Sequence, residues 1–173
     1  GALTLTGANT YTGPTTISAG TLLLGGSGRL GGGSYAGNIS IASGASLTNS
    51  SSTNQIFSGI ISGAGSLTKN TSAASTLTLS GANTYTGGTT ITAGTVSLGS
   101  AGALGPSGTI SFGGGTLQHS ASNTTDYSGR FNTGGSQSWS IDTNGQNVTY
   151  ASALQGAAST ITKLGTGILT LSG

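Results

Sequence analysis

The chain has 173 residues, of which only 3% are charged, and a formal net charge of +2 at pH 7. Its four Lys and Arg residues stand singly along the chain, so they cannot form the cationic stripe that nucleic-acid binding requires, and we expect no nucleic-acid partner. The absence of cysteine excludes a disulfide framework and a thiolate metal site.

Short alternations of apolar and polar residues recur along the chain and predict β-strands with one buried face. In chain order they stand at 3–6 (LTLT), 38–42 (NISIA), 75–80 (STLTLS) and 168–172 (ILTLS). Gly and Asn lie between them, and both residue types accept the positive φ angles of tight turns. No segment shows the helical spacing of apolar residues, so we expect an all-β protein.

The strands belong to a long internal repeat. The segment GALTLTGANTYTGPTTISAGTLLLG (1–25) returns as STLTLSGANTYTGGTTITAGTVSLG (75–99), and a third copy begins at 167–173. Equivalent residues of the first two copies, such as Leu5 and Leu79, lie 74 positions apart. Since one coil of a solenoid takes about two dozen residues, this spacing predicts about three coils.

The segments between the copies also correspond, but the second is longer. Phe57 aligns with Tyr127, 70 positions later, whereas Lys69 aligns with Lys163, 94 positions later. The second unit has therefore gained 24 residues, about one more coil. A stacked solenoid tolerates such an insertion because every other coil keeps its neighbours.

These patterns predict a parallel β-helix of roughly seven coils, an excerpt of a longer repeat array. A single β-helical domain covers 1–173, with repeat units 1–74 and 75–166 and the start of a third unit at 167–173.

Two pairs of residues are expected to mark equivalent turns of the repeat. Asn9 and Asn83 stand at the same point of the two copies, where an amide side chain can bond to local backbone groups. Tyr11 and Tyr85 follow two residues later, and we interpret them as a structural pair that packs at the turn. Stacking of these tyrosines against a ligand is the alternative.

The unit resembles the autotransporter-associated β-strand repeat of bacterial secreted passenger domains. This resemblance implies a right-handed parallel β-helix, export through an outer-membrane translocator barrel, and display outside the cell at the bacterial surface. It brings no catalytic residues to transfer. The first copy departs from the pattern at Pro14, where the second has Gly88, and proline removes a backbone N–H from that turn.

Few residues could carry chemistry, and we expect no enzyme, no metal and no cofactor. His119, the only histidine, lies seven residues before Asp126 in a Ser- and Asn-rich stretch, which chance explains better than a catalytic triad. Asp126 and Asp142 are the only carboxylates, and we place them at different turns, which disfavours a glycosidase pair. The letters GSGRLG at 26–31 match a dinucleotide-binding pattern, but no helix is expected to follow them.

The sequence thus predicts a structural stalk or scaffold segment of a secreted bacterial surface protein. Its coils would stack head to tail on neighbouring repeats or on copies of the same chain, which would give fibres. The alternative is an adhesin that binds host or matrix glycans on the same scaffold. Its ligand surface would lie around Trp139, Tyr127 and Arg130 in the enlarged unit, although a core tryptophan is the simpler interpretation of Trp139.

Overall fold

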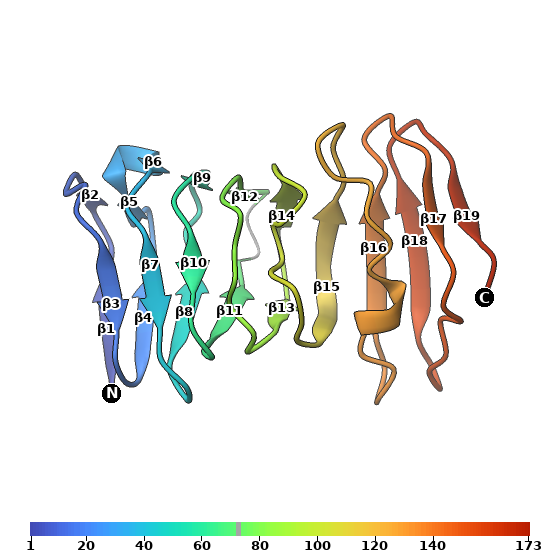
Figure 1. Ribbon diagram of the computed structural model, residues 1–173, viewed down its shortest axis with the longest axis horizontal. Helices are drawn as coiled ribbons and strands as arrows, with labels where there is room; N and C mark the ends of the chain where they lie inside the picture. Colours follow the sequence, from blue (N-terminus) through green and yellow to red (C-terminus); the bar gives the residue numbers. More distant parts are fainter. Residues whose placement is uncertain (72–73) are drawn as a thin grey trace.

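The computed structural model describes residues 1–71 and 74–173 and shows a parallel β-helix of about eight coils, close to the seven expected. The coils stack side by side along the long axis, with the chain beginning at one end and finishing at the other (Figure 1). All pairings between the named strands are parallel. In the described part of the chain, the only helical segments are two 3-10 turns, η1 (Gly31–Gly33) and η2 (Ser128–Arg130).

Each coil has three sides, here called faces 1, 2 and 3 in the order in which the chain passes them. Face 1 contains β1 (Ala2–Leu5), β4 (Thr21–Leu24), β8 (Ser46–Asn49), β11 (Ser66–Lys69) and β13 (Thr89–Ile91). Face 2 contains β2 (Ala8–Asn9), β5 (Arg29–Leu30), β6 (Ser34–Tyr35), β9 (Gln55–Phe57), β12 (Thr76–Leu79), β14 (Thr95–Leu98), β16 (Ser138–Asp142) and β18 (Thr160–Leu164). Face 3 contains β3 (Thr15–Ile17), β7 (Ile39–Ile41), β10 (Ile61–Ser62), β17 (Val148–Tyr150) and β19 (Leu169–Leu171).

One strand turns a corner of the helix without a break. β15 (Ile110–Gln118) pairs with β13 on face 1 through its first residues and with β14 on face 2 through its last. Three glycines separate the two halves, and the middle one, Gly114, has φ of 125°, a value that side chains rarely adopt. At the third, Gly115, an added Cβ would lie 2.6 Å from Ile91 of the coil below, so the corner requires glycine.

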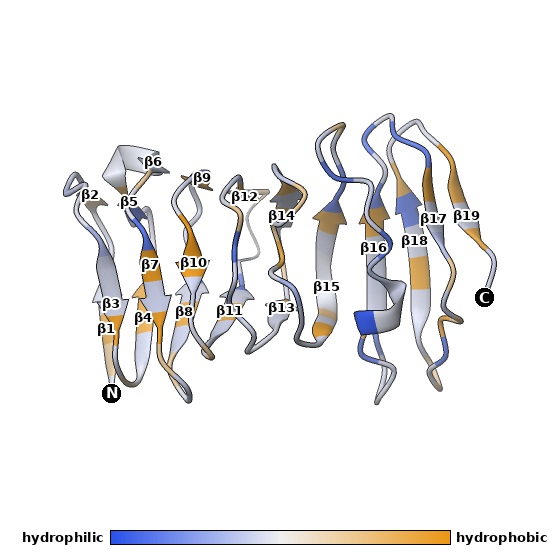
Figure 2. Cartoon of the chain, in the orientation of Figure 1, coloured by the Kyte–Doolittle hydropathy of each residue, from blue (hydrophilic) through white to orange (hydrophobic). Residues whose placement is uncertain are grey.

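The core consists of columns in which one apolar side chain stacks on the next, coil after coil. On face 1, Leu22, Leu47 and Leu67 are direct register partners and all are buried. On face 2, Leu77, Val96 and Leu117 form the equivalent column. Burying one such side chain contributes about 1.5–3 kcal/mol. Hydrophobic segments accordingly recur along the strands of the whole stack (Figure 2).

The copies of the repeat do not occupy the same faces. In the first copy LTL lies on face 1 in β1 and TTI on face 3 in β3, whereas in the second LTL lies on face 2 in β12 and TTI on face 1 in β13. The third copy has its LTL on face 3 in β19. Each copy is thus turned one face further around the axis, because the 74 residues make three coils and one additional face, close to the three coils expected. The three faces consist of similar short strands and turns, so the same repeat sequence can form a strand on any of them.

The inserted residues of the second unit form one complete additional coil, as expected. This coil begins at Phe131, which bridges to Ile110 on face 1, and continues through β16 on face 2 and β17 on face 3. β16 pairs with β15 on one side and with β18 on the other, so the inserted coil is stacked like the rest.

Amide side chains connect coils where the backbone ladder is interrupted. Oδ1 of Asn83 accepts a hydrogen bond from the backbone N–H of Ile61 at 2.8 Å, and its Nδ2 donates to the Ala103 carbonyl at 2.7 Å. One buried asparagine therefore joins three consecutive coils. Such bonds satisfy backbone groups at the corners, where an unpaired N–H or C=O would be costly.

Candidate functional site

The three residues proposed as a ligand surface do not form an open aromatic platform. Trp139 is 3% exposed and lies on the inward side of β16, next to Ile161 in β18. Tyr127 is 4% exposed, and its hydroxyl accepts a hydrogen bond from Nδ2 of Asn123 at 2.8 Å. Both rings are therefore packed within the coils, and contact of either with a glycan would require the coil to open. A ligand role for them stays a prediction.

Arg130 joins the turn of η2 to the preceding coil. Its guanidinium group donates to backbone carbonyls of Gly108 (2.9 Å, from Nε), Gly105 (3.0 Å, from Nη1), Leu104 (2.9 Å, from Nη2) and Ser107 (2.6 Å, from Nη2). Its Cζ also lies 5.5 Å from the centre of the Tyr127 ring. Four of its five N–H groups are thus used by carbonyls around Pro106 that lack strand partners, which gives Arg130 a structural role.

A shallow hollow adjoins this arginine on the outside of the helix. It has a volume of about 370 Å³ and is lined by the 106–109 turn and by Gly129, Arg130 and Phe131. Ser107 and Thr109 are exposed at its rim. This hollow, unlike the rings of Trp139 and Tyr127, is open to solvent.

The tyrosine of the repeat makes the same local contact in both copies, whereas the asparagine does not. The Tyr11 hydroxyl lies 3.1 Å from Oγ1 of Thr15, and the Tyr85 hydroxyl lies 2.6 Å from Oγ1 of Thr89. Their environments differ, because Tyr11 is 43% exposed and Tyr85 is fully buried. Burial raises the pKa of Tyr85 to about 12. Asn9 binds the Gly7 carbonyl at 2.9 Å and lacks the three-coil connection that Asn83 makes.

The residues that could carry catalysis are engaged in structural contacts. Nδ1 of His119 lies 3.1 Å from the Asn123 carbonyl, which can only accept, so Nδ1 carries the proton and Nε2 accepts from the Tyr150 hydroxyl at 2.8 Å. The Asp126 carboxylate accepts from both the N–H and the hydroxyl of Ser128, and these bonds hold the pKa of Asp126 below its usual value against desolvation. Within 1–71 and 74–173, no three His, Asp or Glu side chains lie close enough together to hold a metal ion.

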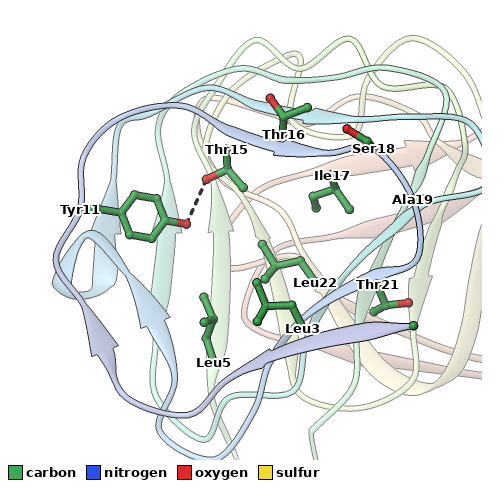
Figure 3. A pocket seen from close by; sticks show the side chains of 11 residues that line it. Leu3, Leu5, Tyr11, Thr15, Thr16, Ile17, Ser18, Ala19, Thr21 and Leu22 are labelled. Carbon is green, nitrogen blue, oxygen red and sulfur yellow. Dashed lines mark hydrogen bonds between the residues drawn. The ribbon is translucent and has the colours of Figure 1, made fainter.

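The interior of the first coil opens to solvent at the start of the stack. This mouth has a volume of about 430 Å³, and the side chains of Leu3, Leu5, Ile17 and Leu22 point into it (Figure 3). Among the described residues, β1 pairs with β4 on one side and with no strand on the other, so that edge of β1 is open. The mouth therefore combines an apolar surface with an open strand edge.

Sequence analysis missed a polar cluster inside the stack, formed by Asn49, Lys69 and Ser75. Lys69 is fully buried, and its Nζ donates to Oδ1 of Asn49 at 3.1 Å and to Oγ of Ser75 at 2.8 Å. The signal was present in SLTK (66–69), because Leu67 and Lys69 point to the same side of a strand. Because Leu67 points into the core, Lys69, two residues later in the same strand, is expected to point inward as well.

Comparison with known proteins identifies the repeat. A family model described as the passenger-associated-transport-repeat matches residues 1–24, 74–98 and 161–173, about a third of the chain. No curated protein and no solved structure matches the chain. Among the described residues no helix is long and apolar enough to span a membrane. The first two matched segments are the complete copies and the third is the beginning of another, so the chain is a β-helical segment built on the passenger-associated-transport repeat, as its resemblance to autotransporter passenger repeats indicated.

Proposed function

We propose that this segment is part of a structural stalk in a bacterial protein that is secreted or displayed at the cell surface. The observation that carries the proposal is the uninterrupted stack, in which each repeat copy takes the next face and every coil supports its neighbours. The scarcity of charge supports it further, because four Lys and Arg residues offer trypsin-like proteases few cleavage sites. The proposed role is that of a scaffold without catalytic activity.

Surface labelling of cells that produce the parent protein tests this role. A protein that carries the native stack should be accessible to antibody on intact cells. Leu77→Asp places a charge in the inward column and should reduce display, because folding of the stack outside the cell is expected to assist export. Thr78→Asp, whose side chain points outward from the same strand, is the matched control and should be displayed normally. Labelling of the native protein only after lysis, or equal display of both variants, would contradict the proposal.

We propose further that coil ends of this kind stack head to tail, either on neighbouring repeats of the parent protein or on other copies of this chain. The mouth beside β1 offers an apolar surface and an open edge, and the last coil exposes Ile161, Ile168 and Leu171. Light scattering should show association that rises with concentration and weakens in Leu3→Asp. A monodisperse monomer at high concentration would eliminate stacking between copies.

The second candidate is an adhesin that binds host or matrix glycans. The hollow beside Arg130 favours it, since it is the open concave surface close to the enlarged unit. Binding to a glycan array that is lost in Ser107→Trp, which fills the hollow, would support this candidate. Unchanged binding in that variant would place any glycan contact elsewhere.

A further inference from the structure

Counted from the start of the chain, β8 belongs to coil 3 and β11 to coil 4, and the buried cluster between these coils places an amine next to a carboxamide. Asn49 at the end of β8 and Lys69 at the end of β11 are direct register partners on face 1, and both side chains point inward. The hydrogen bond of 3.1 Å from Nζ to Oδ1 places the nitrogen beside the carbonyl group of the amide. Nδ2 of Asn49 is buried and has no hydrogen-bond partner among the described residues, so nothing there retains it.

Lys69 is buried without a carboxylate at its side. The only two acidic residues of the chain, Asp126 and Asp142, lie on later coils. The described partners of Nζ are neutral oxygens, and the Ser75 hydroxyl in turn donates to the Ser51 carbonyl at 2.7 Å. Burial lowers the pKa of Lys69 to about 8, because an ammonium ion is poorly solvated in the core. The side chain is therefore available in part as the neutral, nucleophilic amine near neutral pH.

We propose that Lys69 and Asn49 condense to an isopeptide bond that covalently joins coil 3 to coil 4. The lone pair of Nζ attacks Cγ of Asn49 and forms the new C–N bond. The bond from Cγ to Nδ2 breaks, Nδ2 takes the proton that Nζ gives up, and one molecule of ammonia leaves. The reaction is balanced without an oxidant, a reductant or a second substrate.

The fold supplies the positioning that this reaction needs. Both groups are held on adjacent strands in register, and holding two reacting groups together in this way lowers the entropic part of the barrier to their reaction. The Ser75 hydroxyl oxygen accepts a hydrogen bond from the amine and holds it in position. Exclusion of water from the cluster also disfavours hydrolysis of the amide in place of aminolysis.

The bond would give a cysteine-free chain the advantage of a covalent cross-link. It closes a loop from Asn49 to Lys69 and restricts the unfolded chain, as a disulfide does. Unlike a disulfide it is insensitive to reduction. The cross-link would also hold two coils together when the stack is pulled along its axis.

The intact mass of the purified chain tests the proposal directly. We expect a mass lower than the calculated value by one ammonia molecule. Fragmentation of a protease digest should yield one branched product that contains both Asn49 and Lys69, with no tryptic cleavage after Lys69. A chain that retains its full calculated mass, in fresh and in aged preparations alike, would overturn the proposal whether or not any variant folds.

Three variants locate the loss of mass. Asn49→Ala and Lys69→Gln should each have their full calculated masses. Lys163→Gln is the matched control, because Lys163 occupies the equivalent repeat position but has Ile141 as its register partner in place of an asparagine. It should keep the deficit of one ammonia. A deficit that persists in Asn49→Ala would show that ammonia is lost elsewhere and would equally overturn the proposal.

Discussion

The two complete copies of the repeat, 1–25 and 75–99, share 18 of their 25 residues but differ in what covers them. Leu77 and Tyr85 in the second copy are fully buried, whereas their equivalents Leu3 and Tyr11 are 62% and 43% exposed. The second copy has a coil on each side, and the first lies at the open mouth of the stack. In a solenoid, therefore, the contribution of a residue depends on the neighbouring coils as much as on its own strand.

Truncation of the core leucine should show the largest difference between the copies. Leu77→Ala leaves a cavity between two coils and should lower the free energy of unfolding by about 2–5 kcal/mol. Leu3→Ala should cost about 0.5 kcal/mol or less, as expected for an exposed position. Urea unfolding followed by circular dichroism measures both. Equal costs would mean that the first coil is covered in solution, for instance by another copy.

Removal of the tyrosine hydroxyl should give the next largest difference. Tyr85→Phe breaks the 2.6 Å contact with Thr89 and leaves that buried hydroxyl without its partner, at a cost of about 1–3 kcal/mol. Tyr11→Phe breaks the same contact with Thr15 where water can replace it, so little change is expected. Combining Tyr85→Phe with Thr89→Val in a double-mutant cycle isolates the pairwise energy. A coupling near zero would assign the cost of Tyr85→Phe to packing.

The pH dependence of stability should depend on a difference between the segments that follow the two copies. The offset of 70 that aligns Phe57 with Tyr127 also aligns Asn49 with His119, and both are buried. Burial lowers the pKa of His119 below its usual value, against smaller opposing effects of the Asn123 carbonyl and Asp142. Below pH 6.5 the unfolded chain therefore takes up a proton that the folded chain does not.

The contribution of His119 to stability should accordingly be complete above pH 6.5 and be lost as the pH drops towards the folded-state pKa of His119. The slope cannot exceed about 1.4 kcal/mol per pH unit, the limit for one proton. Asp126, whose pKa is also lowered, loses its own stabilising contribution only at more acidic pH. His119→Gln should flatten the profile between pH 7 and pH 5. A profile that stays steep in this variant would assign the loss to another group.

The β-helical architecture could be predicted from the sequence because its strands and turns recur along the chain. Alternation in LTL and NISIA defines strands with one inward face, and the 24-residue insertion predicted the extra coil that β16 and β17 form. The rotation of successive copies was not predicted, since it depends on how many residues each corner takes. Register partners lie 19 residues apart between Ala2 and Thr21 but 25 apart between Thr21 and Ser46, where η1 lengthens the coil.

The candidate sites were harder to predict because burial cannot be read from residue type alone. Trp139 and Tyr127 stand among polar residues, as aromatic residues that bind ligands often do. In the structure, however, the side chains of both are buried inside their coils. The four carbonyl contacts of Arg130 could not be predicted from the sequence, because they depend on the fold of the 104–108 turn one coil earlier. The alternation of β11 predicts that Lys69 points inward like Leu67, but a charged residue is normally expected to point outward.

The smallest predicted effect concerns the turn at which the copies differ most in sequence. Pro14 is exposed, whereas its equivalent Gly88 is buried with φ of 86°, and an added Cβ there would lie 2.7 Å from the Thr109 carbonyl oxygen. The second copy therefore requires glycine, and the first is free to use proline to restrict its unfolded chain. Pro14→Gly should lower the free energy of unfolding by about 0.4–1 kcal/mol, measured by urea unfolding. A gain in stability would instead show that Pro14 strains its turn, and that glycine is the more stable residue at this position in both copies.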